Sequence, residues 1–330
     1  MPKNNKKIYL LLAGGTVLID KQGHFYSVQK KEDIALWLAQ MPELNILADM
    51  ETVLLAGEDD VLQFSHWENM ARIIKVKAGQ ADGFVIVAPV EQLAQTGAIL
   101  GFLLQNFSKT IILTGASISG TDYNQKKALI KELRDKHSGS GLKSNLINAI
   151  QVASQTLPGP AIMFGTRLIP AVKAIPANSN DRANMFVSQD NNYWGRVDFG
   201  ISIKSGLQTS KPRENIYDKI SAKILTLQDV RGVDWNLDKN DLLKYEAIIV
   251  KLAGNYQLEK EKQLLLEKSG RSVILYHREL SVGSGSLVCL ADCTWETAVA
   301  KTLWAVANRK KLPAFEKVMK QNIAGEFNNT

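Results

Sequence analysis

The chain has 330 residues, of which 45% are hydrophobic and 22% are charged, with a formal net charge of +7. This composition is that of a globular protein, excludes a disordered or collagen-like chain, and predicts about two domains at this length. Lysine is spread along the sequence and is not interleaved with aromatic residues, so we interpret the charge as a solvated basic surface and expect no nucleic-acid partner.

The first apolar run, Ile8–Ala13, is too short for a signal-peptide core or a membrane span, and no later run approaches twenty residues. We therefore expect a cytoplasmic protein with no membrane partner. Cys289 and Cys293 lie in an apolar segment and are interpreted as buried thiols, with a disulfide or a shared metal as the alternative. The four histidines are scattered, so we expect no metal and no cofactor.

The first part of the chain predicts a strand–helix–strand unit. Ile8–Ala13 predicts a strand that ends in a glycine turn, and Phe84–Val87 predicts a second buried strand. Apolar residues at helical spacing predict a helix from about Glu91 to Phe107, and Thr110–Leu113 predicts the next strand. Ligands of parallel sheets bind beyond the carboxyl ends of the strands. Chemistry is therefore expected in the turns after these strands, which are Gly14–Thr16, Ala88–Val90 and Thr114–Ala116.

The second part of the chain predicts a smaller α/β domain. The segments 136–144 and 204–214 read as loops, and apolar runs after them predict the strands 222–227, 247–252 and 272–276 with a helix near 259–268. We therefore expect an α/β fold with a larger N-terminal parallel-sheet domain at 1–205, a linker at 206–219 and a smaller C-terminal domain at 220–330.

The strongest local pattern is Leu-Leu-Leu-Ala-Gly-Gly-Thr, which ends at Thr16. A phosphate-binding turn is weakly indicated, because no third glycine follows at the dinucleotide-binding spacing. The two glycines could also serve only to tighten a turn. A hydroxyl at the end of a parallel strand is well placed for nucleophilic attack if a base activates it.

Several motifs together resemble those of bacterial, type I cytoplasmic L-asparaginases, in the same order along nearly the whole chain. The segments that carry this resemblance are Ala13–Thr16, Phe25–Ser27, His66–Ala71, Asp82–Ile86, Ile111–Ala116, Asn145–Ala149, Ala253–Asn255, Asp292–Leu303 and Asn322–Glu326. The resemblance implies an asparaginase-like fold, a small amide substrate such as L-asparagine, and a homodimer or homotetramer.

The resemblance also implies site residues. Thr16 is expected to attack the amide, and Tyr26, on a mobile flap, is expected to help activate it. Ala116 is expected beside the substrate, and Asn255 to complete the site of a neighbouring subunit. A second group, Thr-Asp-Lys in the family, normally assists proton transfer.

The second group is altered in this chain. The family's His-Gly-Thr-Asp-Thr motif reads Ala-Pro-Val-Glu-Gln, so that Val90 has no hydroxyl. Glu91 could pair with a substrate ammonium, or be an exposed glutamate favoured at a helix N-terminus. Lys173 stands at the lysine position only if the alignment has a gap; without a gap the position falls at Pro176 or Ala177, and the lysine is lost.

The turn that binds the substrate α-carboxylate is also altered. The family's Asp-Ser-Ser reads Glu58-Asp59-Asp60 here. If Asp59 and Asp60 line the site, they repel a carboxylate and favour an amide with a cationic or neutral end; otherwise they are surface residues of a turn. Our leading hypothesis is an amidohydrolase that uses Thr16. The alternative is a catalytically silent paralogue that binds a ligand or regulates a true asparaginase.

Overall fold

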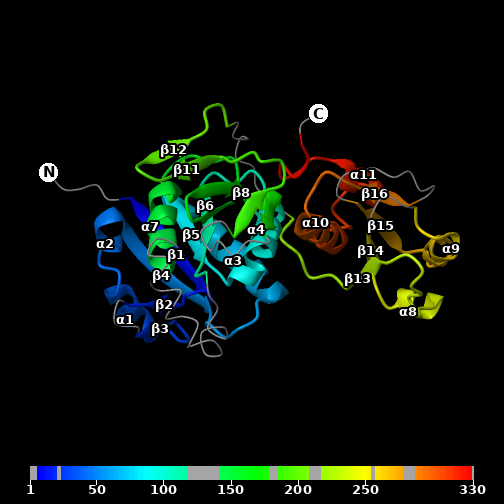
Figure 1. Cartoon of the computed structure of the whole chain (residues 1–330), viewed down its shortest axis with the longest axis horizontal. Helices are drawn as coiled ribbons and strands as arrows, with labels where there is room; N and C mark the ends of the chain where they lie inside the picture. The colour runs from blue at the N-terminus through cyan, green and yellow to red at the C-terminus, as the bar shows by residue number, and fades with distance from the viewer. Residues whose placement is uncertain are drawn as a thin grey trace. The chain divides into compact units, whose positions relative to one another are not determined.

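The structure is a computed structural model that describes residues 6–20, 24–117, 141–177, 185–207, 217–253, 257–277 and 287–328. The chain divides into two compact units, Met1–Asn215 and Ile216–Thr330 (Figure 1). Each unit is an α/β structure with its own sheet, which confirms the predicted fold class.

The first unit is built on an eight-stranded sheet in the order β12-β11-β8-β7-β6-β5-β1-β4. The strands, in the order of the sheet, are β12 (Ile201–Ile203), β11 (Gly195–Val197), β8 (Arg167–Pro170), β7 (Ala161–Phe164), β6 (Thr110–Thr114), β5 (Gly83–Val87), β1 (Lys7–Ala13) and β4 (Asp49–Ala56). The pairs from β4 to β7 are parallel, and those from β7 to β12 are antiparallel. The carboxyl ends of β4, β1, β5 and β6 therefore meet at one edge.

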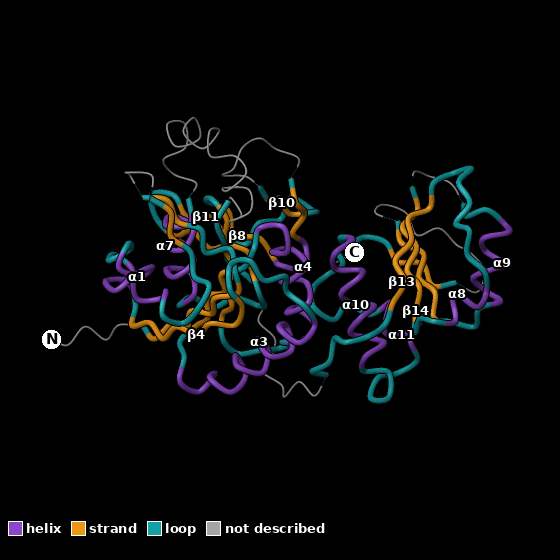
Figure 2. The backbone as a smooth tube through the Cα atoms, turned by 90° about the horizontal axis from the view of Figure 1, so that it is seen from below, coloured by secondary structure: helices purple, strands orange, loops and turns teal. Residues whose placement is uncertain are grey.

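Helices cover both faces of this sheet (Figure 2). One face carries α1 (Asp33–Ala39), α2 (Leu44–Leu47) and α7 (Leu142–Ala153); the other carries α3 (Phe64–Lys77) and α4 (Val90–Leu103). Strand β1 is apolar throughout because it is buried on both faces. Its Leu10 packs in the core cluster that contains Leu146 of α7, and its Tyr9 ring contacts that of Phe84.

The smaller elements of the first unit connect these layers. They are the hairpin of β2 (Leu18–Ile19) and β3 (Phe25–Tyr26), the pair of β9 (Ala174–Pro176) and β10 (Phe186–Ser188), and the short helices η1 (Ala78–Gln80) and η2 (Ala171–Lys173).

Two sequence-based boundaries differ from the structure. Helix α4 ends at Leu103, four residues before the predicted Phe107, because Asn106 adopts a positive φ of 54° that ends the helical path. Helix α7 begins at Leu142, inside the segment that we predicted as a loop. The predicted strands 247–252 and 272–276 are confirmed with the same bounds.

The second unit has a four-stranded parallel sheet in the order β13-β14-β15-β16. Its elements are β13 (Ile224–Asp229), α8 (Lys239–Leu243), β14 (Ala247–Leu252), α9 (Lys260–Lys268), β15 (Ser272–Tyr276), β16 (Val288–Leu290), α10 (Trp295–Ala307) and α11 (Phe315–Lys320). Strands β14 and β15 contribute to a core that also contains Leu242 of α8 and Leu266 of α9.

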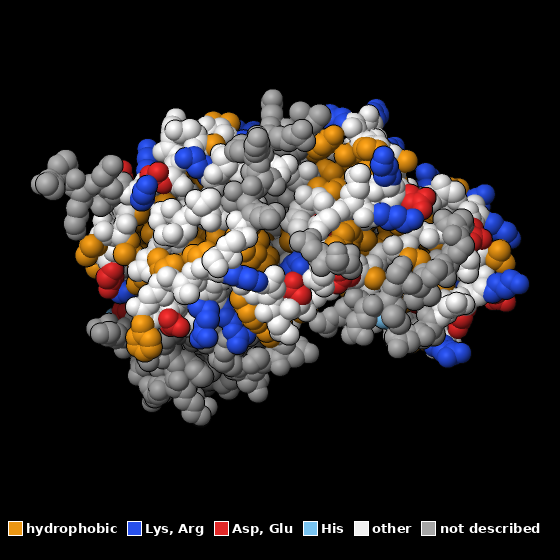
Figure 3. Space-filling model, turned by 90° about the horizontal axis from the view of Figure 1, so that it is seen from above, with side chains coloured by type: hydrophobic (Ala, Val, Ile, Leu, Met, Phe, Trp, Pro, Cys, Tyr) orange, Lys and Arg blue, Asp and Glu red, His pale blue; other side chains and the backbone are white. Residues whose placement is uncertain are grey.

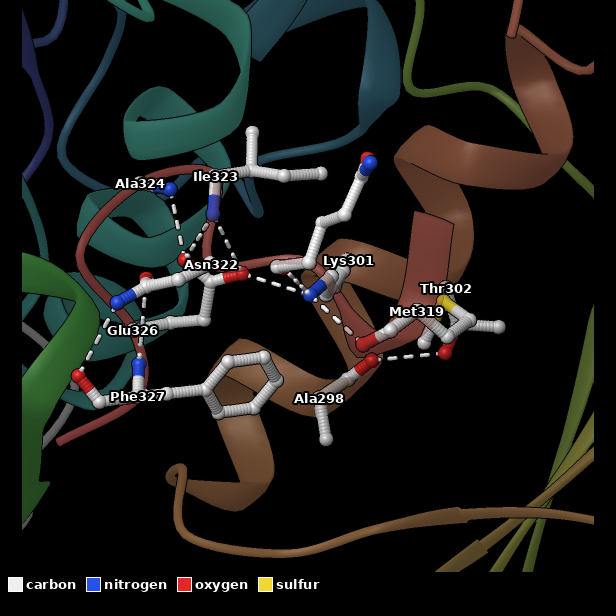
Figure 4. A network of polar contacts seen from close by, with 10 residues as sticks. Ala298, Lys301, Thr302, Met319, Asn322, Ile323, Ala324, Glu326 and Phe327 are labelled. Atoms are coloured by element: carbon white, nitrogen blue, oxygen red, sulfur yellow. Dashed lines mark hydrogen bonds and ion pairs between the residues drawn. The ribbon is translucent and has the colours of Figure 1, made fainter. Parts of the chain in front are cut away.

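A buried ion pair attaches the segment after α11 to helix α10 (Figure 4). Lys301 and Glu326 are both fully buried, and their Nζ and Oε1 atoms lie 2.7 Å apart. Lys301 Nζ also donates to the carbonyl oxygens of Met319 and Gln321. Burial lowers the pKa of Lys301, although the nearby Glu326 carboxylate opposes that shift.

Candidate active site

The turns that follow β1, β5 and β6 meet at the carboxyl edge of the first sheet. The backbone N–H of Ala116 donates to the carbonyl oxygen of Gly15 at 2.8 Å. A Cβ atom on Gly15 would lie 2.1 Å from the carbonyl oxygen of Ala88, and one on Gly115 would lie 2.2 Å from the same atom. Gly15 also has a φ of +66°. Only glycine fits these two close approaches, so the turns form a tightly packed frame.

Thr16 stands on this frame with its hydroxyl against a buried carboxylate. Thr16 Oγ1 donates to Glu58 Oε2 at 2.7 Å, and the Thr16 backbone N–H donates to the same oxygen at 2.5 Å. Glu58 comes two residues after β4, which is the neighbour of β1 in the sheet. The Glu58 residue is only 8% exposed, and hydrogen bonds from two donors offset the cost of burying its charge.

Val28 connects the same two residues from a third segment. Its backbone N–H donates to Thr16 Oγ1 at 2.9 Å, and its carbonyl oxygen accepts from the backbone N–H of Glu58 at 3.0 Å. The hydroxyl of Thr16 therefore accepts one hydrogen bond and donates another. Thr16, Val28 and Glu58 form a closed hydrogen-bonded ring that fixes the orientation of the hydroxyl.

A surface pocket of about 290 Å³ lies beside this ring, lined by Phe25, Tyr26, Ser27, Gln29, Asp33, Leu36 and Trp37. Trp37 connects the pocket to the ring, because its Nε1 donates to the carbonyl oxygen of Thr16 at 2.7 Å. Tyr26 lies on β3, and its hydroxyl donates a long 3.4 Å hydrogen bond to Asp20 Oδ2. The pocket thus places Tyr26 next to a residue that contacts Thr16.

The two aspartates after Glu58 have other partners. Asp59 is exposed, and its Oδ2 accepts from Gln29 Nε2 at 2.7 Å. Asp60 Oδ2 accepts from the backbone N–H of Gly57 at 2.7 Å, which closes the turn. The carboxylate that reaches Thr16 is therefore that of Glu58.

Val90 and Glu91 form the first turn of α4, directly after the frame residue Ala88 and Pro89. Val90 is half-buried, and the Glu91 side chain is exposed. A glutamate in this position interacts favourably with the helix dipole. Its position is also compatible with the predicted contact to a substrate cation, which stays a prediction.

Lys173 forms an ion pair with a residue outside the hydroxyl ring. Its Nζ lies 2.7 Å from Asp190 Oδ2, and both side chains are largely buried. Burial opposes the ionisation of Asp190, but hydrogen bonds from Lys173, Ser188 and a backbone N–H outweigh it and lower its pKa. This pair gives Lys173 a structural role; a catalytic role for it stays a prediction.

Helix η2, which carries Lys173, packs against the middle of α4. A Cβ atom on Gly97 would lie 2.8 Å from the Cβ atom of Ala171, the first residue of η2. Gly97 lies about two turns along α4 from Val90, a distance of about 10 Å. The backbone of η2 is therefore placed by the body of the helix, not by the turn that carries Val90 and Glu91.

Two polar residues of this edge are not distinguished by the sequence patterns. Glu58 enters those patterns only as part of a three-residue turn. Asn145 of α7 is fully buried; its Nδ2 donates to the carbonyl oxygen of Gly115 at 3.0 Å, and its Oδ1 accepts from the backbone N–H of Gly165 at 3.0 Å. A buried asparagine on an otherwise apolar helix face is the available signal for this position. Asn255 lies outside the described residues.

Other classes of ligand find less support in the same described ranges. They contain no group of three or more His, Cys, Asp or Glu side chains arranged to hold a metal ion. Within them, no helix combines the length and the apolar character needed to cross a bilayer. On the face drawn in Figure 3, Lys and Arg side chains lie in several separate groups among Asp and Glu. The absence of a nucleic-acid partner stays a prediction.

Comparison with known proteins agrees with this architecture. Residues 7–128 match the family model of the asparaginase N-terminal domain. L-asparaginase 1 of Escherichia coli K12 is 24% identical, over 98% of both chains. A glutamyl-tRNA(Gln) amidotransferase polypeptide of Pyrococcus abyssi is 23% identical, over 97% of this chain and 76% of its own length. The crystal structure of L-asparaginase I from Vibrio cholerae matches with a TM-score of 0.74 at 21% identity, over 98% of this chain and all of that one.

Proposed function

Because the chain is a member of the asparaginase family, we propose that it hydrolyses a small amide with Thr16 as the nucleophile, releasing ammonia. The observation that supports this proposal best is the 2.7 Å hydrogen bond from the Thr16 hydroxyl to Glu58. A hydroxyl becomes an effective nucleophile when a proton acceptor lies within hydrogen-bond reach, and this one stands at the carboxyl edge of a parallel sheet.

The substrate we propose is an amide with a neutral or cationic end. Glu58, Asp59 and Asp60 follow one another after β4, and Glu91 begins the adjacent helix. A substrate carboxylate near these groups would be repelled, whereas an ammonium would be attracted. L-Asparagine, with its free α-carboxylate, is therefore expected to be a poorer substrate than an asparagine amide or ester.

The assembly and compartment are part of the same proposal. We expect a homodimer or homotetramer in the cytoplasm, with Asn255 of one subunit completing the site of another. No cofactor is required, because the attack and the proton transfers use side chains and water alone.

One observation favours the second candidate, a catalytically silent paralogue. The Thr16 side chain is fully buried, and its hydroxyl already holds one donor and one acceptor. A substrate carbonyl can reach Oγ1 only if the segment that carries Val28 moves. If it does not move, the site is closed, and the chain would act by binding a ligand or a related asparaginase.

Ammonia release from a panel of amides separates the two candidates. The panel contains L-asparagine, L-glutamine, asparagine amide and β-aspartyl amides, each with wild type and Thr16→Ala. Thr96→Ala is the matched control, because Thr96 is also a fully buried threonine, hydrogen-bonded to Trp67 Nε1. Release that is lost in Thr16→Ala but retained in the control would support the hydrolase. A folded wild type that releases no ammonia from any amide would favour the silent paralogue.

A further inference from the structure

We infer that Glu58 is the catalytic base of this site: it takes the proton of the Thr16 hydroxyl and later delivers it to the leaving ammonia. This inference rests on the proposed amide hydrolysis and adds the residue that moves the proton. Its basis is that Glu58 Oε2 lies 2.7 Å from Thr16 Oγ1, within direct proton-transfer distance.

The geometry holds the carboxylate in one orientation. Oε2 accepts from both the backbone N–H and the hydroxyl of Thr16, at 2.5 and 2.7 Å. The backbone of Glu58 is held in turn by its hydrogen bond to the carbonyl oxygen of Val28. A base that is fixed against its nucleophile before substrate arrives loses little conformational freedom during the reaction.

The other candidate bases are placed less favourably. Val90 carries no ionisable or hydroxyl group. Lys173 Nζ is ion-paired with Asp190 and not with the Thr16 hydroxyl. The Tyr26 hydroxyl is directed to Asp20. Among the described residues, the side-chain acceptor bonded to the Thr16 hydroxyl proton is the Glu58 carboxylate.

The reaction balances with these two residues and water. As the Thr16 oxygen forms a bond to the amide carbon, its proton passes to Glu58, and the carbonyl electrons move onto the substrate oxygen. The carbon–nitrogen bond then breaks, Glu58 returns the proton to nitrogen, and ammonia leaves an ester on Thr16. Water attacks that ester, giving a proton to Glu58, which passes it to the Thr16 oxygen as the acid is released.

Glu58→Gln tests this assignment, because it keeps the size and a hydrogen-bond acceptor but removes the base. Glu51→Gln is the matched control: Glu51 lies in β4, the strand that precedes Glu58, and its carboxylate pairs with Lys7 and Lys77. Two rates are measured for each protein. One is ammonia release from the best neutral amide, and the other is acylation of Thr16 by p-nitrophenyl acetate, followed by intact mass and peptide mapping.

We expect Glu58→Gln to lower both rates by about 10²- to 10⁴-fold, the usual contribution of a general base, while Glu51→Gln retains them. Thermal unfolding verifies that each variant is folded. If Glu58→Gln does not fold, Glu58→Asp keeps the carboxylate but draws it back by one methylene, and it is expected to lower both rates by about tenfold or more.

The outcomes separate this inference from the proposed function. If Thr16→Ala abolishes ammonia release but Glu58→Gln retains it, the hydrolase stands and Glu58 is not its base. If folded wild type neither releases ammonia nor becomes acylated, the proposed function fails and the assignment of Glu58 fails with it. Loss of both rates in Glu58→Gln alone supports the assignment.

Discussion

The indole Nε1 of Trp37 donates a 2.7 Å hydrogen bond to the carbonyl oxygen of Thr16, so a core tryptophan holds the backbone of the proposed nucleophile. Trp37→Phe keeps most of the ring but leaves that buried carbonyl without this donor. We expect a loss of about 1–3 kcal/mol in the free energy of unfolding. We also expect slower acylation of Thr16 by p-nitrophenyl acetate, because the nucleophile is held less firmly.

The matched control for that change is Trp67→Phe. Trp67 is also buried and donates through Nε1, but to Thr96 between α3 and α4. It should lose a similar amount of stability while Thr16 is acylated at the wild-type rate. Equal acylation rates in Trp37→Phe and wild type would contradict a positioning role for Trp37.

Gly15→Ala is expected to prevent folding of the first unit. The new methyl would lie 2.1 Å from the carbonyl oxygen of Ala88, at a residue whose φ is +66°. Gly206→Ala separates the two effects, because Gly206 has a φ of +77° and no atom within 4 Å of the added Cβ. That variant should lose only about 1–2 kcal/mol. Urea unfolding measures both, and similar losses would show that the contact with Ala88 is not tight.

Breaking the buried pair of Lys301 and Glu326 should destabilise the second unit strongly. Glu326→Leu or Lys301→Met alone leaves a buried charge without its partner and is expected to cost about 3–5 kcal/mol. The double variant should cost clearly less than the sum, since no charge remains buried. A double-mutant cycle by urea unfolding measures the coupling, and additive losses would contradict it.

Asp190 predicts an acid-sensitive contribution to stability. Hydrogen bonds from Lys173, Ser188 and a backbone N–H outweigh the effect of burial and hold the pKa of Asp190 below its unfolded value. A lowered carboxyl pKa stabilises the fold above the unfolded value, about pH 4, and this contribution is lost as the pH falls through the folded pKa.

Asp190→Asn is therefore expected to lower the free energy of unfolding by about 1–3 kcal/mol near neutral pH. The difference from wild type should shrink as the pH falls below about 4. Urea unfolding at several pH values measures it. A difference that stays constant into this acid range would show that the ion pair contributes no stability.

Much of the fold could be predicted because its signals are local. The strands 247–252 and 272–276 are short apolar runs between polar segments, and the structure has the same bounds for both. The start of α7 at Leu142 differs from the prediction because Ser and Gly dominate the residues before it, and their turn preference does not extend into the helix. The backbone angle of Asn106, which ends α4 early, likewise depends on its surroundings.

The site was harder to predict, because it depends on which residue of a turn points inward. Three carboxylates follow one another from Glu58 to Asp60, and the sequence does not distinguish them. In the structure, Glu58 reaches Thr16, while Asp59 and Asp60 bond to neighbours in their own part of the surface. That choice is made by Val28, from a separate and earlier segment, through backbone hydrogen bonds that leave no residue-type pattern.

The close packing of Gly15 and Gly115 against Ala88 has an evolutionary consequence. These contacts are made by backbone atoms, so the frame that positions the site does not depend on the side chains that perform chemistry. Substitutions at Val90 or Glu58 can therefore accumulate without loss of the fold. A lineage built on this frame can change its substrate, or lose catalysis and later regain it, through a few point substitutions at the edge of the sheet.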